Sequence, residues 1–280
     1  MMKRLIAITA LCLCSSMLWA KGLVVSIHPL YLIAEEVTKG VEQPELLLGN
    51  QSGHDIQLTP ENRKAIQDAE LVIWLGKAHE APLDKLLSNN PNAVSLLNSG
   101  VLQVLPLRDL KGQPIPNAVD THVWLEPNNA VRIAFFIAAL RSKQHPEHKD
   151  QYWANARDFS KRLYAETHKF GRYKVPAQYW TYHDAYHYLE RSLNLEIAGV
   201  LTPDPHVPPT VSQIKYLNDH RPYHRMCLLA EGEASSNQYQ KLQPIQFQPV
   251  EESLAGETQF IPAWRDLATK VQDCVQSSRN

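Results

Sequence analysis

Short apolar runs alternate with helical segments along most of the chain, and this alternation limits the folds that the chain can adopt. Residues 23–28 and 71–75 are rich in β-branched and other apolar side chains, as buried strands are. Between these runs, Thr59 and Pro60 supply the N-cap and the first position of a helix that we expect to end near residue 69. Strands that alternate with helices form parallel sheets with covered faces. The sequence therefore predicts an α/β fold.

The same alternation returns after a long helix and indicates a second αβ unit. We expect this helix to begin after Pro146 and to extend to about residue 173, before Pro176 breaks the pattern. Two αβ lobes with parallel-type sheets, joined by one long linker helix, are the predicted architecture. In the second lobe we expect strands at 179–182, 196–201 and 226–231 and helices at 185–193, 211–219 and 262–275.

The predicted lobes have the following limits. The N-terminal αβ lobe covers residues 21–143, the linker helix covers residues 144–175, and the C-terminal αβ lobe covers residues 176–280. Within the first lobe, residues 108–121 contain glycine and several prolines, so we expect an exposed loop there.

The first twenty residues have the pattern of a secretory signal peptide. Lys3 and Arg4 precede a mainly apolar stretch over residues 5–18, and the small residue Ala20 follows. We expect cleavage after Ala20, and a buried N-terminal helix is the alternative. The apolar stretch is too short to span a bilayer comfortably, and no other long apolar run follows, so we do not expect the mature protein to cross a membrane.

The charge balance and the cysteine content limit the kinds of function that we expect for the chain. The chain has 28 Lys and Arg against 29 Asp and Glu, and without a basic excess a nucleic-acid-binding surface is not expected. Cys227 and Cys274 are the only cysteines outside the expected signal peptide. An even pair in an exported chain predicts a disulfide, with two buried free thiols as the alternative.

Three of the twelve histidines lie on loops that precede expected helices. His54 lies between a strand and the capped helix, His122 lies just before another helix, and His183 lies where a strand meets a helix. In parallel sheets such loops gather at the carboxyl ends of the strands, where ligands bind. If the three neutral imidazoles met there, they would form a site for zinc or another borderline metal.

Acidic residues next to these histidines suggest supporting contacts. Asp55 and Asp184 directly follow histidines, and Asp120 lies two residues before His122. A carboxylate can hold the second ring nitrogen of a metal-bound imidazole and fix its tautomer. Capping of the loops by aspartate is an equally good interpretation of these three positions.

One rival motif contains His183 and His187. Their i, i+4 spacing resembles the zinc-binding pair of H-E-x-x-H proteases, but the general-base glutamate is replaced by Asp184. The sequence contains no glycine-rich phosphate loop, no G-x-S-x-G elbow and no paired CxxC motif. We therefore do not expect an enzyme, and a zinc hydrolase remains an unfavoured alternative.

Four segments together resemble the periplasmic substrate-binding proteins of zinc and manganese ABC importers (cluster A-I). The likeness extends over roughly residues 23–275, is closest to the zinc-binding members, and implies two αβ lobes that are joined by one rigid helix with the metal between them. The segments are VVSIHPLYLIAEEVTKG, GHDIQLTPENRKAIQDAELVIWLG, HVWLEPNNAVRIA and YHDAYHYLERSLNLEIAGVLTPDPHVPP.

The resemblance implies a set of metal ligands. His54 matches the first family histidine, His122 matches the H-x-W-L-x-P motif, and His183 matches H-D-A-Y. Manganese-binding members have an acid at this third position, so His183 favours zinc. Many members take a fourth ligand from a D-P-L-G segment, which VEESLAGE replaces here. Glu252, Glu251 or water could therefore fill the fourth position.

The resemblance also implies a function. Some zinc-binding members join a cysteine of a late strand to one of the last helix, as Cys227 and Cys274 would do here. Many also carry a long histidine-rich loop before the second ligand, whereas residues 112–121 contain no histidine. The implied protein is a soluble periplasmic monomer that binds Zn²⁺ with high affinity and delivers it to the inner-membrane permease of an ABC transporter. A manganese or iron carrier, and a zinc buffer or adhesin without transport, are the alternatives.

Overall fold

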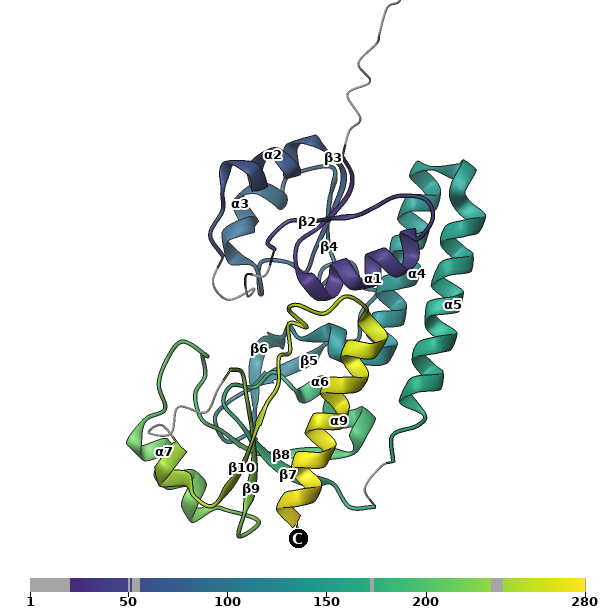
Figure 1. Cartoon of the computed structure of the whole chain (residues 1–280). Helices are drawn as coiled ribbons and strands as arrows, with labels where there is room; N and C mark the ends of the chain where they lie inside the picture. The colour runs from purple at the N-terminus through teal and green to yellow at the C-terminus, as the bar shows by residue number, and fades with distance from the viewer. Residues whose placement is uncertain (1–20, 50, 52–55, 172–173, 233–238, 280) are drawn as a thin grey trace, which may run out of the picture.

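The computed structural model describes residues 21–279 apart from 50, 52–55, 172–173 and 233–238. It contains two four-stranded sheets, which form the cores of an upper and a lower lobe in the view of Figure 1. The strand order is β2-β1-β3-β4 in the N-terminal sheet and β10-β9-β7-β8 in the C-terminal sheet, and the strands pair in parallel. The predicted α/β fold with two parallel-sheet lobes is confirmed.

In the N-terminal lobe the start of a helix follows from local sequence chemistry. The Thr59 side chain accepts a hydrogen bond from the Asn62 backbone N–H, and the Asn62 side chain accepts one from the Thr59 N–H. This capping box, with Pro60 at the first position, fixes the beginning of α2. The elements of the lobe are β1 (Lys21–Val25), α1 (His28–Thr38), β2 (Glu45–Leu46), α2 (Pro60–Asp68), β3 (Ala69–Trp74), α3 (Asp84–Leu87) and β4 (Ala93–Ser95).

Two long helices, α4 (Pro127–Gln144) and α5 (Lys149–Thr167), lie side by side along one flank of the molecule (Figure 1). The predicted long helix is thus the second of a pair, and it ends at Thr167 rather than near residue 173. Arg141 on α4 is 1% exposed and forms a bidentate ion pair with Glu42, at 2.7 and 2.6 Å. Since both partners are charged and the geometry is bidentate, this pair holds α4 firmly against the N-terminal lobe.

A disulfide joins a strand to a helix in the C-terminal lobe. Cys227 of β9 is bonded to Cys274 of α9, which confirms the predicted pairing.

The edge strand β10 was not predicted, because its alternating glutamines give little apolar signal. None of the described helices combines the length and apolar character that crossing a membrane requires. The elements of the lobe are β7 (Ala177–Thr181), α6 (His187–Leu193), β8 (Leu195–Val200), α7 (Val211–Asp219), β9 (Met226–Ala230), β10 (Ile245–Pro249) and α9 (Phe260–Arg279).

The prediction of an exposed loop at residues 108–121 is wrong. An antiparallel β-hairpin occupies this region, with strands β5 (Leu105–Arg108) and β6 (Pro114–Asp120). The hairpin packs on the C-terminal lobe, where the Val200 N–H donates to the Leu110 carbonyl at 3.2 Å. Prolines concealed the second strand, because proline cannot donate a ladder hydrogen bond and is tolerated only where that bond is not needed.

Candidate metal centre

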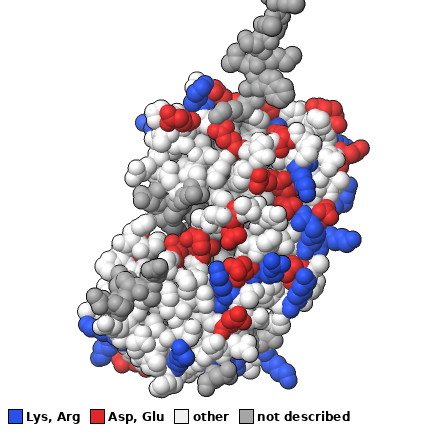
Figure 2. All heavy atoms as spheres, viewed as in Figure 1, with Lys and Arg blue, Asp and Glu red and all other residues white. Residues whose placement is uncertain are grey.

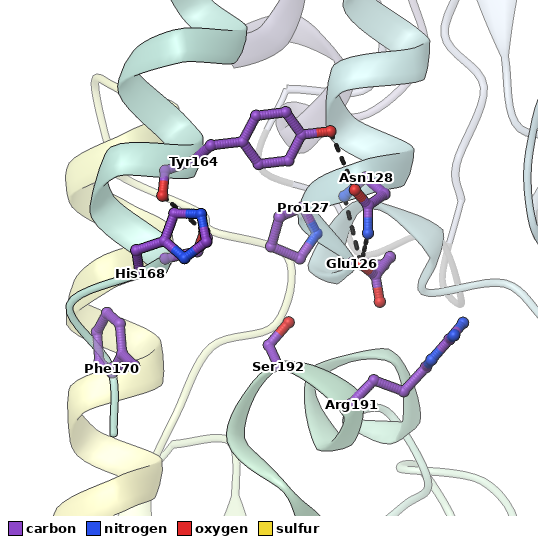
Figure 3. A pocket seen from close by; sticks show the side chains of 9 residues that line it. Glu126, Pro127, Asn128, Tyr164, His168, Phe170, Arg191 and Ser192 are labelled. Atoms are coloured by element: carbon purple, nitrogen blue, oxygen red, sulfur yellow. Dashed lines mark hydrogen bonds between the residues drawn. The ribbon is translucent and has the colours of Figure 1, made fainter. Parts of the chain in front are cut away.

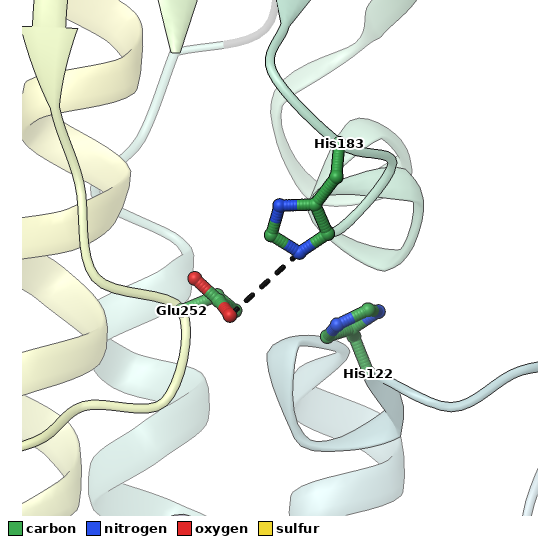
Figure 4. Close-up of side chains that lie close together, drawn as sticks. All are labelled: His122, His183 and Glu252. Carbon is green, nitrogen blue, oxygen red and sulfur yellow. Dashed lines mark ion pairs between the residues drawn. The ribbon is translucent and has the colours of Figure 1, made fainter. Parts of the chain in front are cut away.

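Three side chains from distant parts of the chain converge at one end of the C-terminal sheet (Figure 4). His183 follows β7 by two residues, Glu252 follows β10 by three, and His122 follows the hairpin strand β6 by two. One potential ligand atom from each lies within 4.8 Å of the others. The carboxyl ends of β7 and β10 therefore supply two of the three groups, as expected for loops that follow parallel strands.

The dimensions of this cluster suit a zinc ion. His183 Nε2 lies 3.8 Å from Glu252 Oε1, and the rings of His122 and His183 have their centroids 5.7 Å apart. In a tetrahedral zinc site with bonds of about 2.0–2.1 Å, neighbouring ligand atoms are about 3.4 Å apart. A contraction of a few tenths of an ångström would therefore bring the imidazole of His183 and the carboxylate of Glu252 to coordination distance. All three side chains are at least nine-tenths buried, so water competes little for the ion.

Asp120 orients the imidazole of His122. Its Oδ1 lies 2.8 Å from His122 Nδ1 and also accepts the His122 backbone N–H at 3.0 Å. Because Nδ1 is engaged by a fully buried carboxylate, Nε2 is the nitrogen that a metal would take. Both interpretations of Asp120 therefore hold, since its carboxylate contacts the ring and also caps the loop.

Asp184 has a different partner from the one that the sequence suggested. Instead of serving the adjacent imidazole of His183, its carboxylate receives two hydrogen bonds from the guanidinium of Arg108, at 2.8 and 2.6 Å. Arg108 belongs to the hairpin that the sequence did not reveal, and no local pattern links two residues 76 positions apart. A further histidine, His79, lies close to the site. This buried histidine contacts Thr121 at 2.8 Å and lies edge-on to the ring of His122.

Glu252 has the environment of a carboxylate that needs a cation. Burial raises its pKa well above the usual range, and the nearby carboxyls of Glu231 and Glu251 raise it further. Among the described residues, no N–H or hydroxyl donates to its Oε2. A divalent ion beside such a group favours its ionised form and takes the place of the proton. The indole N–H of Trp124 donates to the Glu252 carbonyl at 2.7 Å and anchors the loop.

The structure distinguishes among the other candidate metal ligands. Glu252, rather than Glu251, joins the two histidines, while Glu251 belongs to a cluster with Glu231 and Glu252. His54 lies outside the described residues, so its role stays a prediction. Because α6 begins only at His187, the pair with His183 does not lie one turn apart on a helix, as the protease-like motif would require.

A groove beside the long helices is distinct from this cluster. It has a volume of about 730 Å³ and lies between the start of α4, the end of α5 and α6 (Figure 3). Tyr164 donates to Asn128 at 3.0 Å, and Asn128 donates to Glu126 at 2.8 Å. These side chains therefore satisfy one another and stabilise the first turn of α4. Its lining residues are Glu126, Pro127, Asn128, Tyr164, Thr167, His168, Phe170, Arg191 and Ser192.

The buried carboxyl of Glu80, in the N-terminal lobe, should make the folding stability of the protein depend on pH. Its side chain is fully buried, accepts the Gly76 N–H at 3.0 Å, and has a pKa raised by burial to about 7. An unfolded chain ionises glutamate near pH 4.3, so raising the pH from 5 to 8 makes folding less favourable by about 2 to 3 kcal/mol. The variant Glu80→Gln should not lose this folding stability between pH 5 and pH 8. Urea unfolding from pH 5 to 8 should therefore show its stability rising relative to wild type, and parallel curves would contradict the assignment.

Comparison with known proteins places this chain in a family. A family model described as the zinc-uptake complex component A, periplasmic, matches residues 23–274. The chain belongs to this family. Curated relatives of this zinc-uptake family include the high-affinity zinc uptake system protein ZnuA of Brucella abortus (strain 2308), 28% identical over 244 residues, with 71% of this chain and 72% of the relative covered. The ZnuA protein of Yersinia pestis is 30% identical over 239 residues, with 75% of each chain covered.

Solved structures share the fold of this zinc-uptake family member. A variant of AdcAII from Streptococcus pneumoniae, solved with Zn(II) bound, superposes with a TM-score of 0.75 at 18% identity, over 91% of this chain and 98% of the other. A Mn-bound periplasmic metal binding protein from candidatus Liberibacter asiaticus gives a TM-score of 0.69 at 15% identity, over 91% and 99%. The resemblance seen in the sequence is confirmed, and at these identities the structural matches establish the fold alone.

Proposed function

We propose that this protein binds Zn²⁺ in the periplasm through His122, His183 and Glu252 and delivers it to a membrane ABC transporter. The observation that supports this most strongly is the convergence of two imidazoles and one carboxylate, all buried, within 4.8 Å. His54 is the sequence-based candidate for the remaining ligand. Such a nitrogen-rich set suits zinc. Acidic side chains along the boundary between the lobes, visible on the face in Figure 2, would attract a cation towards the site.

A carrier explains the site better than an enzyme does. Catalytic zinc sites keep one coordination position for water, whereas four protein ligands close the coordination sphere. With His54 added to the described three, no position would be left for a catalytic water.

We further propose that residues 1–20 are removed on export and that the mature protein acts as a monomer. Its parts would be a lobe over residues 21–143, a linker over 144–175 and a lobe over 176–280.

Metal competition tests the choice between zinc and manganese carriers. Imidazole ligands bind zinc more strongly than manganese, as the general order of divalent-metal affinities requires. We expect a hundredfold excess of Mn²⁺ to leave bound zinc in place, measured by atomic emission after desalting. Displacement of zinc under these conditions would favour the manganese carrier.

Acidification should release the metal. Imidazoles must be neutral, and the Glu252 carboxyl must be ionised, to coordinate zinc, so protons compete with the ion. We expect the affinity to fall by at least about a hundredfold from pH 7 to pH 5, since two imidazoles must each lose a proton to bind. A chelator competition series at constant ionic strength measures this change. An affinity that stays flat over this interval would exclude histidine ligation.

A further inference from the structure

We infer that Arg108 is a positioning residue of the zinc site, through which the β5–β6 hairpin sets the separation of His122 and His183. This inference rests on the proposed zinc-binding function and adds to it a residue that touches neither the ion nor a ligand side chain. The β5–β6 hairpin is linked to both histidines, since His122 follows β6 by two residues and Arg108 of β5 binds Asp184, the residue next to His183.

Arg108 is the centre of a buried ion-pair network. Its guanidinium donates to both Asp184 oxygens, at 2.8 and 2.6 Å, and to both Glu190 oxygens, at 3.0 and 2.8 Å. The hydroxyl of Tyr179 also donates to Glu190, at 2.7 Å. The side chain of Arg108 is 6% exposed and that of Asp184 is 5% exposed. Planar, bidentate contacts of this kind fix orientation as well as distance, and a lysine cannot reproduce them.

This network reaches the two proposed ligands by different routes. Asp184 directly follows His183, so the grip of Arg108 on Asp184 fixes the backbone that carries His183. On the other strand of the hairpin, Asp120 lies opposite Leu105 and holds the ring of His122. The hairpin therefore carries His122 itself and holds His183 through one ion pair.

The hairpin is held firmly enough for this task. At its base, the Tyr188 hydroxyl of α6 donates to the Asp120 carbonyl at 2.8 Å and accepts the Leu105 N–H at 2.9 Å. At its tip, the Leu110 carbonyl accepts from Gln213 Nε2 at 3.1 Å. Gly112 approaches β8 so closely that a Cβ there would lie 2.9 Å from the Ile197 side chain. Because both ends are fixed, a shift of Arg108 would be transmitted to the metal site rather than absorbed by the turn.

A matched pair of substitutions separates positioning from folding. Arg108→Lys keeps the charge but loses the planar contacts with Asp184. Arg141→Lys makes the same change in another arginine whose side chain is buried, which is bidentate to Glu42 of the N-terminal lobe. Outer partners of metal ligands typically contribute about 10–100-fold to metal affinity. Because Arg108 acts on His183 only through Asp184, we expect Arg108→Lys to raise the zinc dissociation constant by about tenfold, the lower end of this range, and Arg141→Lys to leave it within about threefold of wild type.

A second readout completes the test. The absorption spectrum of bound Co²⁺ reports ligand geometry, and we expect Arg108→Lys to change it while Arg141→Lys does not. If Arg108→Lys does not fold, Asp184→Asn takes its place, because it alters only the partner next to His183. Tight zinc binding by wild type together with unchanged affinity and spectrum in the Arg108 or Asp184 variant would overturn this inference and leave the proposed function intact. Absence of a tight zinc site in wild type would contradict the proposed function itself, and this inference with it.

Discussion

Replacing His183 by alanine should raise the zinc dissociation constant about a hundredfold to a thousandfold. Structural zinc sites contribute about 10–16 kcal/mol from four ligands, so the loss of one ligand costs about 3 kcal/mol. We expect His122→Ala to have an effect of the same size. Glu252→Gln should also weaken binding strongly, because it removes the only anionic group among the described ligands. The sequence-based prediction for His54→Ala is a loss of the same order.

The histidine content of the chain supplies the controls. His224 is exposed on the C-terminal lobe, and His224→Ala should bind zinc like wild type. His187→Ala should also remain within a few-fold of wild type, since His187 is absent from the described ligand cluster. A zinc hydrolase built on His183 and His187 would instead lose its metal in this variant. Titration against a chromophoric zinc chelator measures every case, and equal losses in the His224 and His183 variants would contradict the site.

Removal of the disulfide should lower the unfolding temperature by about 10 °C. Cys227 and Cys274 are 47 residues apart, and closing a loop of this length stabilises a protein by about 4 kcal/mol in the chain-entropy model. In a chain of this size each kcal/mol changes the midpoint by about 2–4 °C. The effect should be large because the bond ties α9 to β9, at the core of the C-terminal lobe.

The variant with both Cys227→Ala and Cys274→Ala avoids a free thiol. Calorimetry with and without reducing agent then provides an internal control. We expect reduction to lower the midpoint of wild type and to leave that of the double variant unchanged. A wild-type midpoint that does not respond to complete reduction would show that the bond contributes little.

The elements that the sequence predicted best are those with strong local signals. Strands β1, β3 and β9 are short apolar runs that become buried in parallel sheets, and α2 starts at its capping box. Strands β5, β6 and β10 were missed, as was the three-residue strand β4. In β5, β6 and β10, prolines and glutamines interrupt the apolar residues, and these segments form strands because neighbouring backbone pairs with them. In such places tertiary structure determines local structure.

The residues of the site also differ in how far the sequence could predict them. His122 and His183 could be proposed from their loops before helices, since that position has a general geometric meaning in parallel sheets. Glu252 could not be distinguished from Glu251 by sequence, because which of two adjacent side chains faces the histidines depends on the folded loop. Arg108 could not be found at all. Its partner Asp184 is 76 residues away, and an ion pair over that separation has no sequence period.

Anomalous diffraction at the zinc edge from crystals of the zinc-loaded protein tests the central claim most directly. We expect one dominant peak about 2.0–2.2 Å from a ring nitrogen of His122, a ring nitrogen of His183 and a carboxylate oxygen of Glu252. The distances from that peak also identify the remaining ligand. A dominant peak on exposed histidines such as His220 or His224, with none between His122, His183 and Glu252, would contradict it.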